Sequence, residues 1–287
     1  MSGLNGSQMQ IAKTIKLFIG GDFPRTESGR SFPVLAKKTK KVYAHLCRAS
    51  RKDLRNSVTA AQGALSSWSS KSAYNRGQIL YRMAEMMEGK RSEIAEILTE
   101  TLGYTKAQTN KTIDAAVDSL VYFAGWTDKY QQVIGTVNPV SGPHHNFTTP
   151  ESVGIVGLIA DQKFDFANLV SQIAAIIASG NTCVVLMAEE GGATLAPLSE
   201  VLATSDLTKG VVNLLTGQLD ELAGQFGTHM EIQSISCQTA DPKVLATLKE
   251  QGADNMKRIV GPMKEFNSLE HLLSFVEYKT VWHPIGH

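Results

Sequence analysis

Three cysteines are the side chains best suited to nucleophilic chemistry, because a thiolate attacks carbonyl carbons readily. They are Cys47, Cys183 and Cys237. The first two lie inside apolar, strand-like runs, as buried cysteines that act as small hydrophobic residues do. Cys237 ends a third such run, and no His or Lys stands close to it in the sequence to activate the thiol. We therefore expect all three cysteines to be structural.

Carboxylates stand in two predicted loops, where they could serve as general acids or bases. They are Asp161 with Asp165, and Glu189 with Glu190. Neither pair has an evident acid-base counterpart nearby, although the fold could bring one to it. The sequence therefore assigns no catalytic residue.

Glycines that could cradle a phosphate are misplaced. Gly154 and Gly157 stand within a predicted strand rather than after it, and the pair Gly191-Gly192 lacks a following spaced glycine. The dinucleotide fingerprint needs its glycines between a strand and the next helix. Neither match predicts a dinucleotide site.

A later loop argues against phosphate more directly. Asp241 and Pro242 occupy the N-cap and first positions of a predicted helix. A helix amino terminus usually attracts anions, but an aspartate there bonds to the free amides and repels a phosphate. We expect phosphate binding at this helix to be disfavoured.

The remaining polar clusters argue against metal, nucleic-acid and membrane binding. His144 and His145 are adjacent in a predicted turn, without the spacing or carboxylate partner of a metal site. The lysine cluster at 37–41 lacks interleaved aromatic residues, and the formal net charge is only +1. The amino terminus is polar, and no apolar run approaches the roughly 20 residues that span a bilayer. With three unspaced cysteines, the expected location is cytoplasmic.

Hydrophobic residues recur every three or four positions between residues 50 and 130, which predicts a mostly helical layer. The first helix begins at a capping box formed by Ser50 and Asp53. Ser72 and Ser92 can cap two further helices, and Gly103 can end the second of these. Strand-like runs on either side of this layer predict an antiparallel opening over residues 16–47 and a β-hairpin over residues 131–150.

The second half of the chain repeats a strand followed by a helix. Its strand-like runs are short and almost entirely apolar, as strands buried on both faces must be. Such units predict an α/β fold with a Rossmann-like, doubly wound parallel sheet. The expected strands are 152–160, 182–188, 211–215 and 232–237, and the expected helices are 166–179, 194–203, 219–226 and 242–251.

Several stretches resemble the aldehyde dehydrogenase family. The runs at 150–157 (PESVGIVG), 173–182 (IAAIIASGNT) and 210–217 (GVVNLLTG) resemble its cofactor-binding region, and the run at 60–68 (AAQGALSSW) resembles an upstream helix. The resemblance extends to about Val260. It implies NAD or NADP as the cofactor, if there is any.

The sequence departs from that family at the positions that carry its chemistry. Where the family has an asparagine of the oxyanion hole, this chain has Lys163. Glu189 is kept at the position that binds the adenosine ribose, but Leu186 replaces the lysine beside it. The pyrophosphate loop reads Cys237-Gln-Thr-Ala240, and the segment beginning at Gly261 lacks the general-base glutamate. Glu189 and Lys163 are therefore vestigial candidates, and we expect no cofactor.

The end of the chain resembles the family's terminal strand, so a catalytic lobe is missing between two recognisable flanks. This layout resembles the non-catalytic carboxyl-terminal domain of the two-domain family-sixteen enzyme. We expect residues 1–130 and 150–262 to form the cofactor-fold domain, and residues 131–149 and 268–287 to form an oligomerisation arm. The residues expected on the contact face of its last strand are Val276, Tyr278, Thr280 and Trp282.

The favoured hypothesis is a pseudoenzyme that serves dimerisation, scaffolding or protein interaction. Its expected partners are a second copy, other proteins, or a dehydrogenase-like first half of a longer chain. One alternative is a sensor that binds NAD or NADP without catalysis, with Glu189 on the ribose and Lys163 near the phosphates. Another is an active NAD(P)-dependent aldehyde dehydrogenase with Cys237 as nucleophile.

Overall fold

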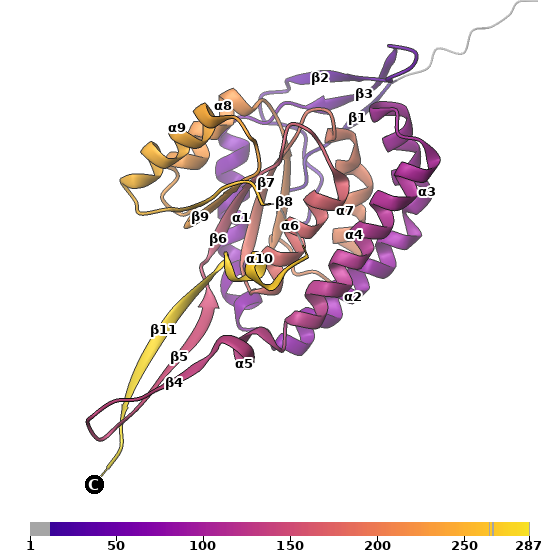
Figure 1. Ribbon diagram of the computed structural model, residues 1–287. Helices are drawn as coiled ribbons and strands as arrows, with labels where there is room; N and C mark the ends of the chain where they lie inside the picture. Colours follow the sequence, from indigo (N-terminus) through magenta and orange to yellow (C-terminus); the bar gives the residue numbers. More distant parts are fainter. Residues whose placement is uncertain (1–11, 264, 266, 287) are drawn as a thin grey trace, which may run out of the picture.

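A five-stranded parallel sheet forms the centre of the molecule (Figure 1). The computed structural model describes residues 12–263, 265 and 267–286. The strand order is β10-β9-β6-β7-β8. The two strands beside β6, β7 and β9, both come after it in the sequence. The strands are β6 (Ile155–Ile159), β7 (Thr182–Met187), β8 (Val212–Thr216), β9 (Ser234–Cys237) and β10 (Arg258–Val260).

Alternate side chains of this sheet enter two separate hydrophobic cores. Val156 and Leu158 of β6 belong to one core, whereas Ile155 and Ile159 belong to the other. Both cores exist because every position of β6 to β9 is buried, so each of these strands packs on both faces. The predicted doubly wound α/β fold is therefore confirmed.

Helices cover both faces of the sheet. On one face lie α6 (Phe166–Ala178) and α7 (Leu195–Thr204), with α10 (Leu269–Leu273) packed beside α6. On the other face lie α1 (Arg51–Ser69), α8 (Leu219–Thr228) and α9 (Pro242–Ala253). The short 3₁₀ turn η2 (Gly192–Thr194) leads into α7.

An outer helical layer packs on α6 and α7. It consists of α2 (Ala73–Gly89), α3 (Arg91–Ile97), the π-helical turn η1 (Leu98–Leu102) and α4 (Lys106–Trp126). The predicted caps at Ser50 and Ser72 are confirmed, because each side chain accepts a backbone hydrogen bond from the residue three positions later. Gly103 ends η1 with a φ of 76°, a left-handed conformation that glycine adopts without strain.

The predicted cap at Ser92 is wrong. The chain turns at Lys90, and α3 begins at Arg91 without a side-chain cap. Ser92 therefore lies inside the first helical turn, where its hydroxyl cannot act as an N-cap.

The predicted antiparallel opening over residues 16–47 contains two antiparallel strands, and the structure adds a further strand just before this range. Together they form a small sheet of β1 (Lys13–Ile15), β2 (Ser31–Leu35) and β3 (Val42–Cys47), in the order β1-β3-β2. Strands β2 and β3 are antiparallel, whereas β1 runs parallel to β3. The long segment between β1 and β2 gives the chain room to cross over before it returns beside β3.

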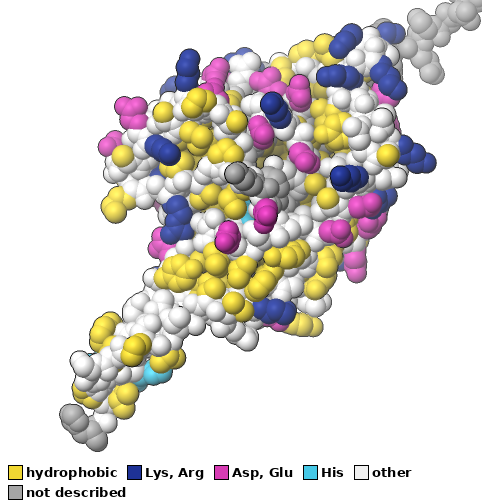
Figure 2. Space-filling model, in the orientation of Figure 1, with side chains coloured by type: hydrophobic (Ala, Val, Ile, Leu, Met, Phe, Trp, Pro, Cys, Tyr) yellow, Lys and Arg dark blue, Asp and Glu magenta, His cyan; other side chains and the backbone are white. Residues whose placement is uncertain are grey.

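A second small sheet projects from the body as a narrow arm (Figures 1 and 2). Its order is β11-β5-β4, with β4 (Thr136–Asn138), β5 (His144–Ser152) and β11 (Val276–Pro284). The hairpin expected over residues 131–150 begins later than predicted, because α5 (Tyr130–Ile134) is helical and buries Tyr130 in the core. Residues 1–11 and 287, which belong to the expected domain and arm, lie outside the described residues.

Candidate functional site

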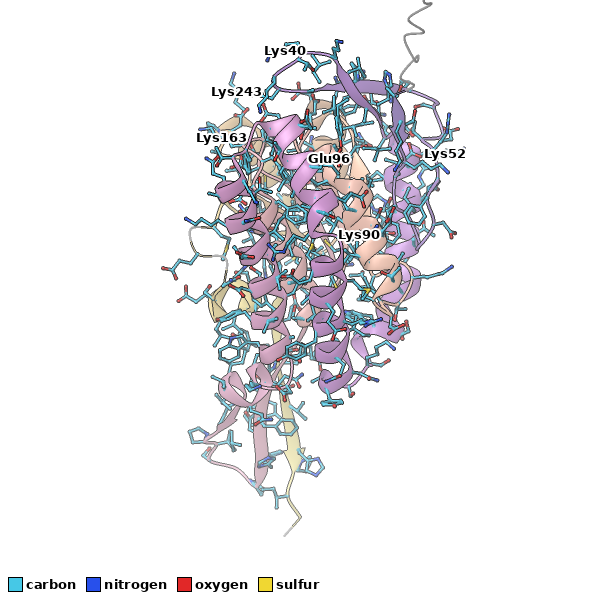
Figure 3. All side chains as sticks on the ribbon, turned by 90° about the vertical axis from the view of Figure 1, so that its right-hand side faces the viewer. Lys40, Lys52, Lys90, Glu96, Lys163 and Lys243 are labelled. Carbon is cyan, nitrogen blue, oxygen red and sulfur yellow. The ribbon has the colours of Figure 1, made fainter. Side chains whose placement is uncertain are left out.

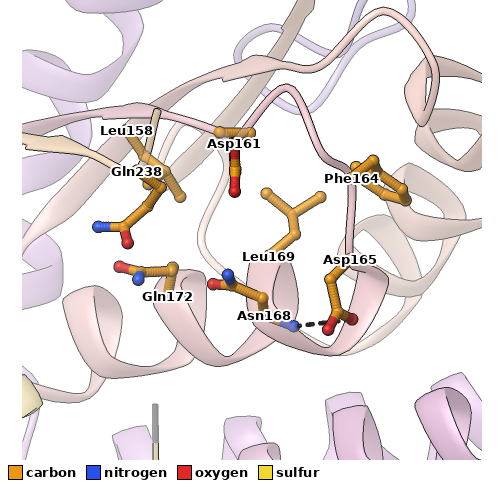
Figure 4. A pocket seen from close by; sticks show the side chains of 9 residues that line it. Leu158, Asp161, Phe164, Asp165, Asn168, Leu169, Gln172 and Gln238 are labelled. Carbon is orange, nitrogen blue, oxygen red and sulfur yellow. Dashed lines mark hydrogen bonds between the residues drawn. The ribbon is translucent and has the colours of Figure 1, made fainter. Parts of the chain in front are cut away.

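The candidate site lies where strand order reverses, between β6 and β9, since ligands of open α/β sheets bind at the carboxyl ends of the strands there. We call this space the switch crevice. Its free volume is about 10 Å³, which is room for about one water molecule. The lining residues, shown in Figure 4, are Leu158, Ala160, Asp161, Phe164, Asp165, Asn168, Leu169, Gln172 and Gln238.

Two glutamines fill the inner part of the switch crevice, where Figure 4 shows them facing one another. Gln238 donates through Nε2 to Ser236 Oγ at 2.9 Å and accepts from the Met263 amide at 3.0 Å. Gln172 Oε1 accepts from Ser236 Oγ at 3.2 Å and lies 2.9 Å from His271 Nε2. These bonds tie β9, α6, α10 and the segment after β10 together. A ligand would have to break them.

An aromatic ring closes the outer part of the switch crevice. Phe164 is 7% exposed, and its ring packs against Gly191, where an added Cβ would lie only 2.2 Å from it. The loop after β6 therefore rests directly on the loop after β7. Glycine is required at position 191 to allow this contact.

Carboxylates occupy the helix amino termini at this edge of the sheet. Asp165 Oδ1 accepts from the Ala167 amide at 2.9 Å, and Asp241 Oδ1 accepts from the Lys243 amide at 2.9 Å. The predicted cap at Asp241, followed by Pro242, is confirmed. The first turn of α8 carries Asp220 and Glu221. The Glu221 carboxylate is paired with Arg30 and Arg48. The amino termini of α6 and α9 thus present a capping carboxylate to a phosphate.

Lys163 and Glu189 do not line one common pocket. Lys163 is exposed at the surface, as Figure 3 shows, and its backbone amide bonds to Asp161. Glu189 lines a different hollow of about 240 Å³, formed with β2, Lys37 and Lys40. A pyrophosphate has no matching space in the switch crevice, so the residues present do not fit a bound dinucleotide.

The three cysteines are buried, as predicted. Cys47 is 2% exposed, and Cys183 and Cys237 are 0% exposed. Burial raises the pKa of the Cys237 thiol to about 11, and burial raises the pKa of Cys183 even further above its usual range. At neutral pH both are therefore protonated and poor nucleophiles.

The last strand carries the residues expected at an oligomer contact. Val276 is 1% exposed and belongs to the core, which corrects its expected place on an open face. Tyr278 and Trp282 are 55% and 60% exposed. Thr280 Oγ1 lies 2.9 Å from Thr148 Oγ1 of the neighbouring strand. These three side chains share one face of β11, at the outer edge of the arm.

Several residues of the site were not recognised from the sequence. Gln172 had a signal, because it is a lone amide within the otherwise apolar inward face of α6. Phe164, Gln238 and His271 had none, since their partners are distant in the sequence. Across the described ranges, no three His, Cys, Asp or Glu side chains gather as metal ligands would. No helix in the same ranges is long and apolar enough to cross a membrane.

The chain is similar in sequence to known aldehyde dehydrogenases. The model of a family described as "Aldehyde dehydrogenase family" matches residues 23–263. Human aldehyde dehydrogenase 1A1 is 29% identical over 250 residues, which cover 85% of this chain and 49% of that protein. The chain spans about half the length of the curated relatives it matches.

Solved structures agree. A point mutant of aldehyde dehydrogenase from Bacillus cereus superposes with a TM-score of 0.82 at 28% identity, covering 87% of this chain and 50% of that one. An NAD⁺ complex of aldehyde dehydrogenase from the same organism gives a TM-score of 0.77 at 26% identity, with the same coverage. With both the sequence match and the shared fold, this chain belongs to the aldehyde dehydrogenase family.

Proposed function

We propose that this chain is a non-catalytic member of the aldehyde dehydrogenase family, a cytoplasmic pseudoenzyme that serves dimerisation and protein interaction. The observation that carries the proposal is the small size of the switch crevice. The chain's own side chains fill it, and a free volume of only about 10 Å³ remains. The layout of the chain resembles the carboxyl-terminal domain of the two-domain family-sixteen enzyme. This resemblance suggests a second partner, a dehydrogenase-like first half of a longer chain.

The chemistry of the crevice supports the loss of catalysis. The position of an oxyanion-hole amide carries the exposed Lys163, and a protonated, fully buried Cys237 is the nearest thiol to the crevice in sequence. Without a thiolate and fixed donors for the developing oxyanion, the family reaction has no site here.

The arm supports an assembly role. A narrow sheet of three strands with solvent on both sides buries little apolar surface, so it is marginal by itself. Its aromatic side chains are exposed, and exposed apolar surface of this kind is typical of an interaction site. A contact between two arms satisfies both needs.

A nucleotide sensor is the second candidate, and the hollow beside Glu189 favours it. That hollow, of about 240 Å³, has Lys37 and Lys40 at its rim and could take one end of a nucleotide. In this case the nucleotide would bind at the hollow beside Glu189, outside the switch crevice, and no reaction would follow.

An assay of aldehyde-dependent NADH or NADPH formation tests the loss of catalysis. We expect no rate above the buffer background with short aliphatic and aromatic aldehydes, because the crevice has neither nucleophile nor space. An active family member in the same assay is the positive control. A saturable rate that disappears in Cys237→Ala would establish the enzyme instead.

A further inference from the structure

Among the described residues, no strand pairs with the outer edge of β11. Two hydrogen bonds fix the phase of the strand, that is, which of its backbone groups point towards β5. The Ile285 amide donates to Pro143 O at 2.9 Å, and the Val153 amide donates to Phe275 O at 3.4 Å. The register between these two bonds is continuous. The N–H and C=O groups of successive residues alternate in direction along a strand. In β11, the backbone groups of odd-numbered residues therefore point towards β5, and those of even-numbered residues point outwards.

An independent contact confirms this phase. Arg258 Nη1 reaches the carbonyl oxygen of Val276 at 2.6 Å. Because β11 is an edge strand, that carbonyl lies on the side opposite β5. The outward amides and carbonyls of Tyr278, Thr280 and Trp282 are therefore available to another strand.

We propose that β11 pairs antiparallel with β11 of a second copy, about a two-fold axis at Thr280. The two arms then form one continuous sheet. This inference rests on the proposed assembly role and adds the partner, the strand and the register.

The side chains are self-complementary in this register. Tyr278 lies opposite Trp282 of the second copy, and the symmetry repeats this aromatic pair on the other side of the axis. On the opposite face, Glu277 lies across from His283. Both kinds of cross-strand pair are favourable, and they cover the two most exposed large hydrophobic side chains of the strand.

The neighbouring registers are worse. An axis at Lys279 places two lysines directly opposite each other, and an axis at Val281 places Lys279 opposite His283. An axis at Tyr278 would pair Glu277 with Lys279, but it would also bring Trp282 against Ser274, where Arg258 and the body occupy the edge.

The end of the strand fits the axis at Thr280 in a further way. Val276 then lies opposite Pro284 of the second copy, and proline has no amide hydrogen to donate. The Val276 carbonyl would be left without a partner, but Arg258 already supplies its donor. The two missing bonds of the shared ladder, one at each end, are thus replaced by the Arg258 contact within each copy.

Mixed disulfide formation tests the register. In the register with the axis at Thr280, Lys279 of one copy lies opposite Val281 of the other as a non-hydrogen-bonded pair. The Cα atoms of such a pair are about 4.5 Å apart, which a disulfide can span. Lys279→Cys and Val281→Cys chains carrying different tags are co-expressed and oxidised. We expect the mixed disulfide to form about tenfold faster than a disulfide of either variant with itself. The native cysteines are buried and should not contribute.

Light scattering of the wild-type chain separates the two levels of the proposal. A dimeric mass together with the mixed disulfide supports both. A dimeric mass with faster self-linking of Lys279→Cys or Val281→Cys, or with no linking, overturns the register and leaves the assembly role. A monodisperse monomer overturns both.

Discussion

Replacing Tyr278 and Trp282 together by alanine is expected to weaken self-association by roughly five orders of magnitude. Each aromatic truncation at the centre of an interface costs about 2 kcal/mol, and about 1.4 kcal/mol corresponds to a tenfold change in affinity. The two-fold symmetry applies each loss twice. Both side chains are more than half exposed in the isolated chain, so its folding stability should change little.

The matched control for this double variant is Tyr74→Ala. Tyr74 lies on α2, distant from the arm in the sequence, and is 70% exposed, so it removes a similar aromatic surface from the body. Sedimentation equilibrium gives the dissociation constants of all three proteins. Equal affinity of the double variant and the wild type would show that the arm does not hold the assembly together.

Replacing Trp68 by alanine is expected to lower the free energy of unfolding by about 3–5 kcal/mol. Trp68 is 0% exposed and joins α1 to the carboxyl-terminal end of α6, where its indole Nε1 donates to Ile177 O at 3.0 Å. The substitution leaves a cavity and a buried carbonyl without its donor. Such a loss is a large part of the roughly 5–15 kcal/mol that stabilises a typical domain.

Denaturant unfolding, followed by circular dichroism, measures this effect. Trp68→Phe keeps most of the packing but removes the donor, so it should cost less than the alanine variant. Tyr74→Ala, at a position that is 70% exposed and outside the proposed interface, is the control and should change the free energy of unfolding by less than about 0.5 kcal/mol. A loss of under about 1 kcal/mol in Trp68→Ala would contradict the role assigned to this contact.

The fold was predictable because its signals are local. The continuous apolar runs of β6 to β9 and the helical periodicity of α1, α2 and α4 are read directly along the chain. Where tertiary contacts decide the conformation, prediction failed. Burial of Tyr130 makes residues 130–134 helical, and the turn at Lys90 moves the start of α3 ahead of Ser92.

The site was predictable only where one loop contains the whole interaction. Asp241 and Pro242 form such a unit, and their helix cap is confirmed. The filling of the switch crevice depends instead on residues far apart in the sequence, such as Gln172 with His271 and Phe164 with Gly191. Periodicity and spacing carry no information about these pairs.

These contacts give a physical account of how a dehydrogenase fold could persist without its reaction. Buried hydrogen bonds of Gln172 and Gln238 join the elements around the switch crevice without a ligand between them. The arm is then the surface that we propose to be functional.

Isothermal titration calorimetry with NAD tests the central claim most directly, with NADP in a second titration. The account predicts no saturable heat with either nucleotide, because the switch crevice is filled and the helix termini beside it carry carboxylates. Saturable binding that is lost in Glu189→Gln, a variant that keeps the size of the side chain, would contradict it and establish a nucleotide sensor.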